Sequence, residues 1–154
     1  MLRAGMQCTL RAGLDTAVWL GRGPQENYPD RQTGAAIGRW KVRIDELEHA
    51  YMRPQENGTR CGVEVLTLEG EKKKLSVEKL DSELFFSAWR YTQEELDKAE
   101  HQHALKRRAD TTLSLDGAMR GVGGDLPGAT ALHEAYVLKA NMEYRLHILI
   151  RAGK

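Results

Sequence analysis

Short apolar runs that end at glycine, proline, asparagine or aspartate constrain the fold of this chain more than any other feature of its sequence. The runs have the length of β-strands, and several alternate apolar with polar residues, as half-buried strands do. Their close spacing is typical of an antiparallel β-sandwich and not of alternating strands and helices. We therefore expect an all-β fold. The predicted strands are 2–10, 17–20, 39–44, 61–68, 75–80, 83–88, 111–115 and 135–150.

The strand at 61–68 shows the clearest alternation. Its odd-numbered residues, among them Val63 and Val65, would share one face of the strand. Leu66 and Leu68 keep the opposite face apolar as well. Strands that are apolar on both faces are usually buried on both faces, so we expect this strand to be covered from two sides.

Turn and capping patterns predict two further features. The polar pair at 81–82 separates two strand-like runs by a short turn, which predicts that these runs form a hairpin. Thr92 is followed by Glu95 three residues later, which is the pattern of a capping box. Apolar residues then recur at helical spacing, so we expect one short helix near 92–99.

Length and charge limit the organisation and the partners of the chain. Its 154 residues have room for one modest core, so we expect a single domain over 1–154. The formal net charge of +1 gives no field that would attract nucleic acid or anionic lipid. The apolar runs are too short to cross a bilayer, and the first residues do not resemble a signal peptide. We expect a cytoplasmic protein with neither nucleic acid nor membrane as a partner.

The cysteine and histidine spacing does not predict a metal site. Cys8 and Cys61 lie far apart and lack the Cys-x-x-Cys spacing of redox and zinc sites, so we expect two free, buried thiols. His101 and His103 would share a face only on a strand, and further ligands nearby are missing. We therefore expect ordinary hydrogen-bonded histidines.

Two loops contain the same sequence, Pro-Gln-Glu-Asn, at 24–27 and at 54–57. Their surroundings differ, which indicates two turns built in the same way and not an internal repeat. The first loop also holds a group of residues that could do chemistry. These residues are Glu26, Tyr28, Asp30 and Arg31. Because Arg31 follows Asp30 directly, we favour a buried ion pair with hydrogen bonds that staple the loop, and catalysis by these acids is the alternative.

A glycine-rich stretch at 121–124 allows close approach of the backbone to another group. A phosphate-binding loop would continue with lysine and serine or threonine. Here Asp125 follows, and Pro127 comes two residues later, which opposes an anion site at a helix start. The pattern favours a tight loop of special shape.

Several blocks of the chain match one known family in the family's own order. The most specific block reads Trp-Leu-Gly-Arg-Gly-Pro-Gln-Glu-Asn-Tyr-Pro-Asp-Arg and starts at Trp19. The matching blocks are 19–35, 53–62, 86–96, 99–105, 113–116 and 121–125. With these blocks, the sequence resembles the C-terminal domain of glycoside hydrolase family 2 β-galactosidases over nearly its whole length.

The resemblance implies a large antiparallel β-sandwich of the galactose-mutarotase-like, or supersandwich, type, which this chain enters partway through. In the family, the two catalytic glutamates and the active-site magnesium lie on a (β/α)₈ barrel that precedes this domain. The resemblance therefore implies no catalytic residue and no cofactor in this chain, and we expect the chain alone to be inactive. A sandwich without its first strands leaves edges and apolar faces uncovered, so we expect docking to a barrel-containing β-galactosidase chain or self-association.

In the family, a loop after Gly-Gly-Asp reaches the active site, where a tryptophan packs against the sugar. The corresponding substrate loop here is formed by Gly123, Gly124, Asp125, Leu126, Pro127 and Gly128. That tryptophan is absent, Ser114 replaces the family's asparagine, and Arg120 replaces its usual methionine. We therefore expect only weak contact with a galactoside. The alternative is a free-standing, non-catalytic sandwich that binds carbohydrate or protein.

Overall fold

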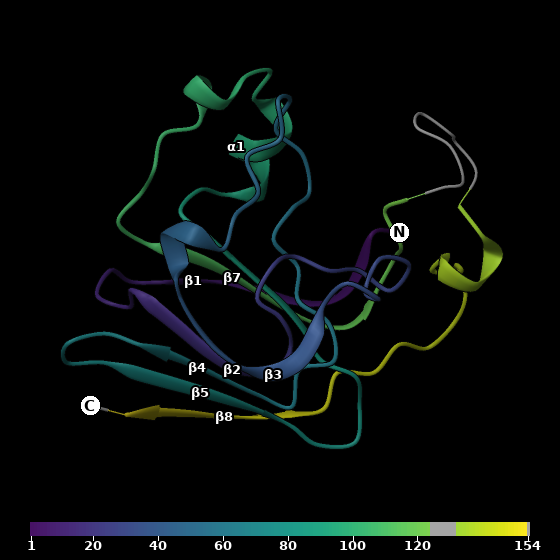
Figure 1. Cartoon of the computed structure of the whole chain (residues 1–154), viewed down its shortest axis with the longest axis horizontal. Helices are drawn as coiled ribbons and strands as arrows, with labels where there is room; N and C mark the ends of the chain where they lie inside the picture. The colour runs from purple at the N-terminus through teal and green to yellow at the C-terminus, as the bar shows by residue number, and fades with distance from the viewer. Residues whose placement is uncertain (124–131, 154) are drawn as a thin grey trace.

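The computed structural model describes residues 1–123 and 132–153. These residues form two antiparallel β-sheets with one short α-helix and three 3-10 turns (Figure 1), which confirms the predicted all-β sandwich. The strands are β1 (Arg3–Leu10), β2 (Thr16–Gly23), β3 (Ala36–Arg43), β4 (Val65–Glu69), β5 (Lys74–Lys79), β6 (Phe85–Trp89), β7 (Thr111–Met119) and β8 (Ile148–Gly153). The helix is α1 (Gln93–Lys98), and the 3-10 turns are η1 (Ile44–Glu46), η2 (Gln102–Ala104) and η3 (Glu134–Tyr136).

The first sheet, sheet A, has the strand order β1-β7-β6, and the second, sheet B, has the order β3-β2-β4-β5-β8. The hairpin predicted around 81–82 is wrong. β5 pairs with β4 and β8 in sheet B, whereas β6 pairs with β7 in sheet A. The polar turn therefore carries the chain from one sheet to the other. A turn sequence marks a change of direction, and it does not say which strand the chain pairs with next.

Two strands are shorter than the sequence predicted. Of the run 135–150, only its last residues are in a strand, because β8 pairs with β5 from Ile148 onward and the residues before it have no neighbouring strand. The run 61–68 becomes a strand only at Val65, which is 37% exposed, whereas Leu66 is fully buried. This strand is therefore covered on one face and not on two.

The predicted helix is confirmed with its cap. The Thr92 hydroxyl accepts a hydrogen bond from the Glu95 amide at 3.1 Å, and the Glu95 carboxylate accepts one from the Thr92 amide at 2.7 Å. These two bonds satisfy donors that a helix start leaves open. Leu96 points inward and packs with Trp89 and Tyr91, so the helix closes over the end of β6. It is the only α-helix among the described residues and is too short to cross a membrane.

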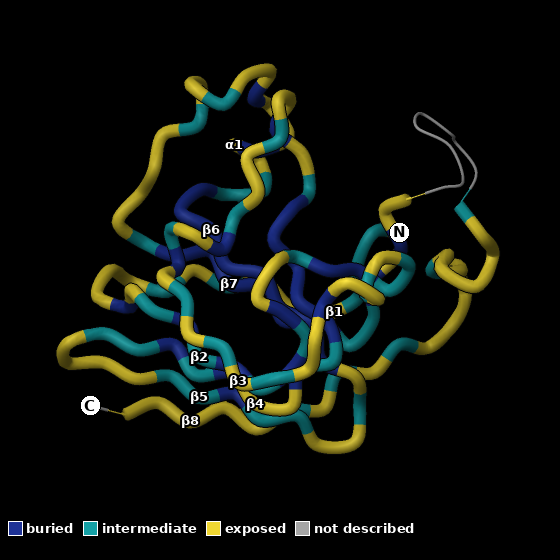
Figure 2. The backbone as a smooth tube through the Cα atoms, in the orientation of Figure 1, coloured by how far each residue is buried: buried dark blue, intermediate teal, exposed yellow. Residues whose placement is uncertain are grey.

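The main core lies between the two sheets. Its centre is an edge-to-face contact between Trp19 of β2 and Phe86 of β6, whose ring centroids are 5.5 Å apart. Leu66 and Leu113 extend this contact along the two sheets, and both are buried. Figure 2 shows that β6 and β7 are the most deeply buried strands. Because aromatic pairs of this geometry exclude much surface from water, this contact fixes the sheets to each other.

A second, smaller apolar cluster lies on the outer face of sheet A. Phe85 and Met119 pack there against Tyr28 and Cys61, which come from loops outside the sheet. Cys61 is buried as expected, whereas Cys8 on β1 is half-buried, and both thiols are free. The cluster attaches the loops that carry the candidate site to sheet A.

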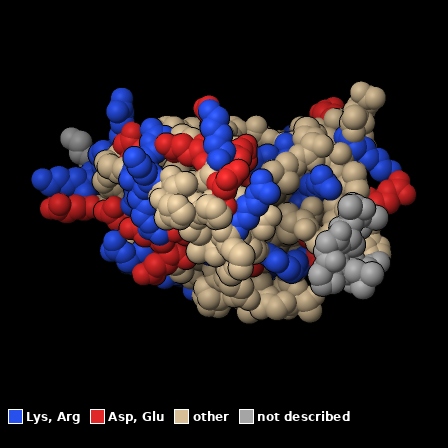
Figure 3. Space-filling model, turned by 90° about the horizontal axis from the view of Figure 1, so that it is seen from above, with Lys and Arg blue, Asp and Glu red and all other residues tan. Residues whose placement is uncertain are grey.

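Lysine and arginine side chains are interspersed with aspartate and glutamate over the surface seen in Figure 3. No large field of one sign covers that face. This mixture agrees with the near-neutral formal net charge of +1. The surface charge therefore does not indicate a particular partner. Function has to be inferred from the arrangement of individual groups.

Replacing Phe86 with alanine would remove the ring that joins the two sheets. We expect Phe86→Ala to lower the free energy of unfolding by about 3–5 kcal/mol, because it leaves a cavity in a closed core. Urea denaturation followed by tryptophan fluorescence measures this loss. Met52→Ala is the control, since Met52 is 91% exposed, and it should change stability by less than about 0.5 kcal/mol. Equal losses in the two variants would contradict the assigned core.

Candidate functional site

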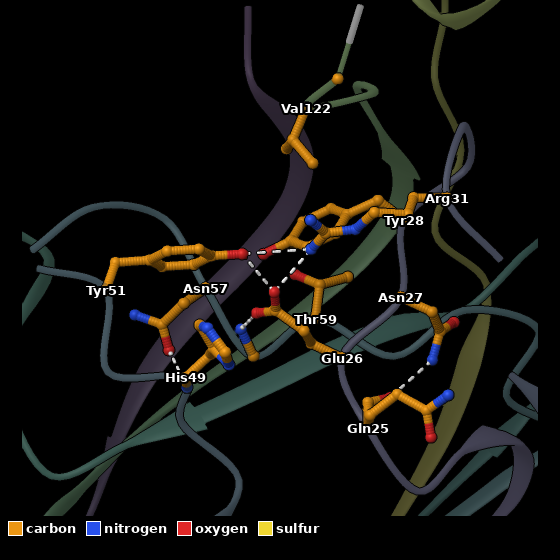
Figure 4. Close-up of polar contacts among 12 residues, drawn as sticks. Gln25, Glu26, Asn27, Tyr28, Arg31, His49, Tyr51, Asn57, Thr59 and Val122 are labelled. Carbon is orange, nitrogen blue, oxygen red and sulfur yellow. Dashed lines mark hydrogen bonds and ion pairs between the residues drawn. The ribbon is translucent and has the colours of Figure 1, made fainter. Parts of the chain in front are cut away.

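The two loops with the sequence Pro-Gln-Glu-Asn lie against each other, and the polar contacts around the first of them are drawn in Figure 4. In each loop the asparagine side chain donates a hydrogen bond to the carbonyl of the glutamine two residues earlier, at 3.0 Å for Asn27 and 2.9 Å for Asn57. The interpretation of two turns built alike is thus confirmed. The loops are joined directly, because the Asn27 amide donates to the Thr59 carbonyl at 2.8 Å.

Glu26 is the centre of the contact between the loops (Figure 4). One carboxylate oxygen accepts from Arg31 at 2.5 Å and from the Tyr51 hydroxyl, and the other accepts from the Gly58 amide at 2.8 Å. Burial and the bond to Glu26 raise the pKa of Tyr51, so this phenol stays a donor. Both oxygens therefore help to hold the loops together.

The ion pair predicted within the loop has a different acid. Arg31 pairs with Glu26 and not with Asp30, and its side chain is 52% exposed and not buried. The guanidinium lies over the ring of Tyr28, 5.5 Å from its centroid. Sequence adjacency of Asp30 and Arg31 was misleading, because the two residues lie in a tight turn closed by backbone hydrogen bonds between Tyr28 and Arg31, and their side chains reach different partners.

Asp30 instead connects the first loop to the end of sheet A. Its two carboxylate oxygens accept hydrogen bonds from the amides of Val122 at 3.1 Å and Gly123 at 2.7 Å. A β-carbon on Gly121 would lie 2.7 Å from the Asp30 carboxyl carbon, so the carboxylate fits only against glycine. Asp30 thereby fixes the backbone from which the predicted substrate loop begins. The remaining residues of that prediction, Gly124, Asp125, Leu126, Pro127 and Gly128, lie outside the described residues.

A buried group of charges lies beneath these loops, and sequence reasoning did not identify it. Arg3 of β1 contacts Glu56 at 2.5 Å and Asp116 of β7 at 3.3 Å. Burial raises the pKa of Asp116 to about 6, against the lowering effect of Arg3, and burial also raises the pKa of Glu56. Tyr28 donates to Glu56 at 3.4 Å. The position of Glu56 in the second Pro-Gln-Glu-Asn sequence was the one signal that could have revealed it.

Arg60 is the second group that the sequence did not reveal. Its guanidinium donates to the carbonyls of Pro24 at 2.9 Å, Leu47 at 2.6 Å and Gly58 at 2.6 Å. It also lies over Trp19, 5.6 Å from the ring centroid. Burial lowers the pKa of Arg60 to about 10, so the group remains charged at neutral pH. A single cation thus joins both loops to the main core.

Two open hollows meet at the wall formed by Arg31 and Tyr51. Their volumes are about 560 Å³ and about 380 Å³. The larger is lined by planar polar groups, including Gln25 and Gln32, and by the rings of His49 and Tyr51. Amide, guanidinium and aromatic groups in an open hollow can hold a hydroxyl-rich ligand. The carboxylates of Glu26 and Asp30 also line this hollow, and both accept hydrogen bonds that hold the loops.

The described residues, 1–123 and 132–153, contain no group of three or more histidine, cysteine, aspartate or glutamate side chains that could hold a metal ion. His101 is the N-cap residue of η2 and His103 lies within it, and their stacked rings have centroids 5.4 Å apart. The absence of metal from this chain remains a prediction.

Comparison with known proteins places this geometry in context. The family model described as "Beta galactosidase small chain" matches residues 1–150. Proteins named β-galactosidase from Erwinia tasmaniensis and Vibrio cholerae are each 35% identical over 98% of this chain, and one from Yersinia enterocolitica is 37% identical over 86%. The matched region makes up only 12–14% of these relatives, so the chain spans about one-seventh of their length or less.

Substituting Asp30 should release the backbone at 122–123. We expect Asp30→Asn to speed hydrogen exchange at the Gly123 amide and to lower the free energy of unfolding by about 1–2 kcal/mol, because an amide group can accept only one of the two bonds. Hydrogen exchange resolved by NMR measures both effects. Asp110→Asn is the matched control, since Asp110 accepts from the Ala12 amide at 2.9 Å in another loop. Unchanged exchange at Gly123 in Asp30→Asn would rule out the anchor.

The buried acid Asp116 should make stability depend on pH. Its pKa is raised above the ordinary value of 3.8, so the folded state binds more protons than the unfolded state between pH 4 and about 6. Stability from this group is therefore lost as the pH rises through that window. We expect the stability of Asp116→Asn relative to the natural chain to increase by roughly 1–3 kcal/mol from pH 4 to pH 7.

Thermal unfolding at both pH values measures this change. Glu71→Gln is the control, because Glu71 lies exposed in the turn between β4 and β5. The Glu71 variant should differ from the natural chain by the same amount at the two pH values. A pH-independent difference for Asp116→Asn would show that this carboxyl has an ordinary pKa in the folded state.

Proposed function

Because this chain belongs to the β-galactosidase small-chain family, we propose that it forms one part of a β-galactosidase, where it completes the assembly and lines one wall of the active site. The observation that carries the proposal is the match of 1–150 to this family. Its relatives named β-galactosidase contain the matched region as a small share of one long chain. The substrate is then a terminal β-D-galactoside.

The contacts made by the described acids favour a structural role for this chain and not a catalytic one. Glycoside hydrolysis needs two carboxyl groups with access to the sugar, one as acid and one as nucleophile or base. Glu26 is surrounded by three donors, Asp30 by two backbone amides, and Glu56 and Asp116 share Arg3. These contacts hold loops in place. We therefore place the two catalytic glutamates, and the magnesium ion, on a barrel domain of the larger chain.

The contribution of this chain would be the loop that starts at Gly123. Asp30 holds the amides at 122–123, and Glu26 and Arg60 hold the loop that carries Asp30. Each link is a charge-assisted hydrogen bond, which is stronger than a bond between neutral groups, and those of Glu26 and Arg60 are also partly buried. The sandwich thereby provides a rigid base for one wall of the site. Rigid support of this kind improves the orientation of a bound sugar.

A second function is favoured by the two hollows beside Arg31 and Tyr51. Planar polar side chains together with aromatic rings are a common way to bind sugars, and both kinds line these hollows. The chain would then be a non-catalytic sandwich that binds carbohydrate without a barrel. This alternative needs no larger chain, which separates it from the first proposal.

Hydrolysis of a chromogenic β-galactoside tests the first proposal. We expect no activity from the purified chain, and activity when it is mixed with the Erwinia tasmaniensis β-galactosidase from which the 151 aligned residues have been deleted. Each component alone is the control. Activity of the chain alone that disappears in Glu26→Gln would overturn the proposal, whereas galactose binding without activity in the mixture, detected by calorimetry, would favour the second function.

A further inference from the structure

The outer strand of sheet A has an unpaired edge. β1 pairs with β7 on one side, and no other strand of the described residues pairs with its second side. Arg3 is the only charged residue of the strand, and its side chain turns away to Glu56 and Asp116. The remaining seven residues are uncharged and include no proline. Exposed edges of this kind are sites where another strand adds.

β3, one of the two outer strands of sheet B, shows how an edge can be protected, whereas β8, the other outer strand, carries only one charged residue, Arg151. β3 carries Arg39, Lys41 and Arg43 at alternate positions, and all three are exposed. Charged residues along an edge strand, lysine above all, prevent pairing with another chain. β1 has no comparable protection over its central and final residues. Its one irregularity is a bulge between Ala4 and Gly5 at the beginning of the strand.

The apolar interior also continues to this edge without being closed. In sheet A, Phe86, Leu115 and Met6 form one row on the inner face of three paired strands. Phe86 and Leu115 are buried, but Met6 is 41% exposed. A separate edge, that of β8 in sheet B, shows the same pattern, since Val77 is buried and its cross-strand partner Ile150 is 43% exposed. Figure 2 shows this exposure along β8.

We propose that the free edge of β1 is the docking site for the larger β-galactosidase chain, which adds one extended segment as a further strand of sheet A. This inference rests on the proposed function. The added strand would form main-chain hydrogen bonds with β1, and an apolar side chain on its inner face would cover Met6. The main-chain hydrogen bonds would supply affinity. The apolar row that ends at Met6 would favour an apolar residue at the adjacent position of the added strand.

The occupant is the larger chain and not a second copy of this one. In the relatives from Erwinia tasmaniensis and Vibrio cholerae, the matched region is 14% of a single long chain. Most of such a chain is therefore available to supply a covering strand.

Binding to the Erwinia tasmaniensis β-galactosidase lacking its 151 aligned residues tests the docking edge. We compare the natural chain with Met6→Lys, which places a charge where the added strand would cover it, and with Ile37→Lys. Ile37 is 71% exposed on β3 and gives the same chemical change on the protected edge. We expect Met6→Lys to bind at least about tenfold more weakly, since an unpaired ammonium would be buried, and Ile37→Lys to bind normally.

Circular dichroism and thermal unfolding establish that both variants are folded. A second measurement needs no substitution: amides along β1 in the natural chain should become protected from hydrogen exchange in the complex. Equal binding by Met6→Lys and the natural chain, or unchanged exchange along β1, would overturn the proposal. A dimer of the natural chain that Met6→Lys dissociates would show that a second copy occupies the edge.

These outcomes are distinct from failure of the proposed function. If Met6→Lys binds as well as the natural chain and the mixture hydrolyses galactosides, the function holds and the docking edge is wrong. If binding depends on Met6 but no hydrolysis follows, the docking edge holds and the function is wrong. If the natural chain does not bind the shortened relative at all, both are overturned.

Discussion

The buried guanidinium of Arg60 is the interaction on which the candidate site depends. It satisfies carbonyl groups from three separate segments and lies over Trp19, so it connects irregular loops to the main core. Loop carbonyls that are removed from water without a donor would destabilise the fold, and one planar group with five donors serves several of them. A lysine could not replace it, because its ammonium lacks this fixed geometry.

Local patterns in the sequence were enough to predict the class of fold. Alternating residues identified β1, β2, β3 and β5 close to their observed positions, and Thr92 with Glu95 identified the helix and its cap. The repeated Pro-Gln-Glu-Asn sequence predicted two similar turns, which the matching hydrogen bonds of Asn27 and Asn57 confirm. Each of these features is decided by residues within a few positions of one another.

Long-range pairing could not be predicted in this way. The turn at 81–82 connects two sheets and not two strands of a hairpin, and the partner of Arg31 is Glu26 and not its neighbour Asp30. The group formed by Arg3, Glu56 and Asp116 joins three distant parts of the chain. Burial decides the charge of such a group, and burial is a property of the folded molecule.

The pairing of β1 with β7 sets the order in which the fold can form. Leu10 pairs with Thr111, and Arg3 pairs with Met119, so sheet A brings the first residues of the chain together with residues made much later. Closing so long a loop costs entropy before any contact offsets it, and such topologies fold slowly. Within this chain, β1 therefore has no strand partner until β7 has been made. A strand with unpaired backbone groups during that interval is prone to aggregation.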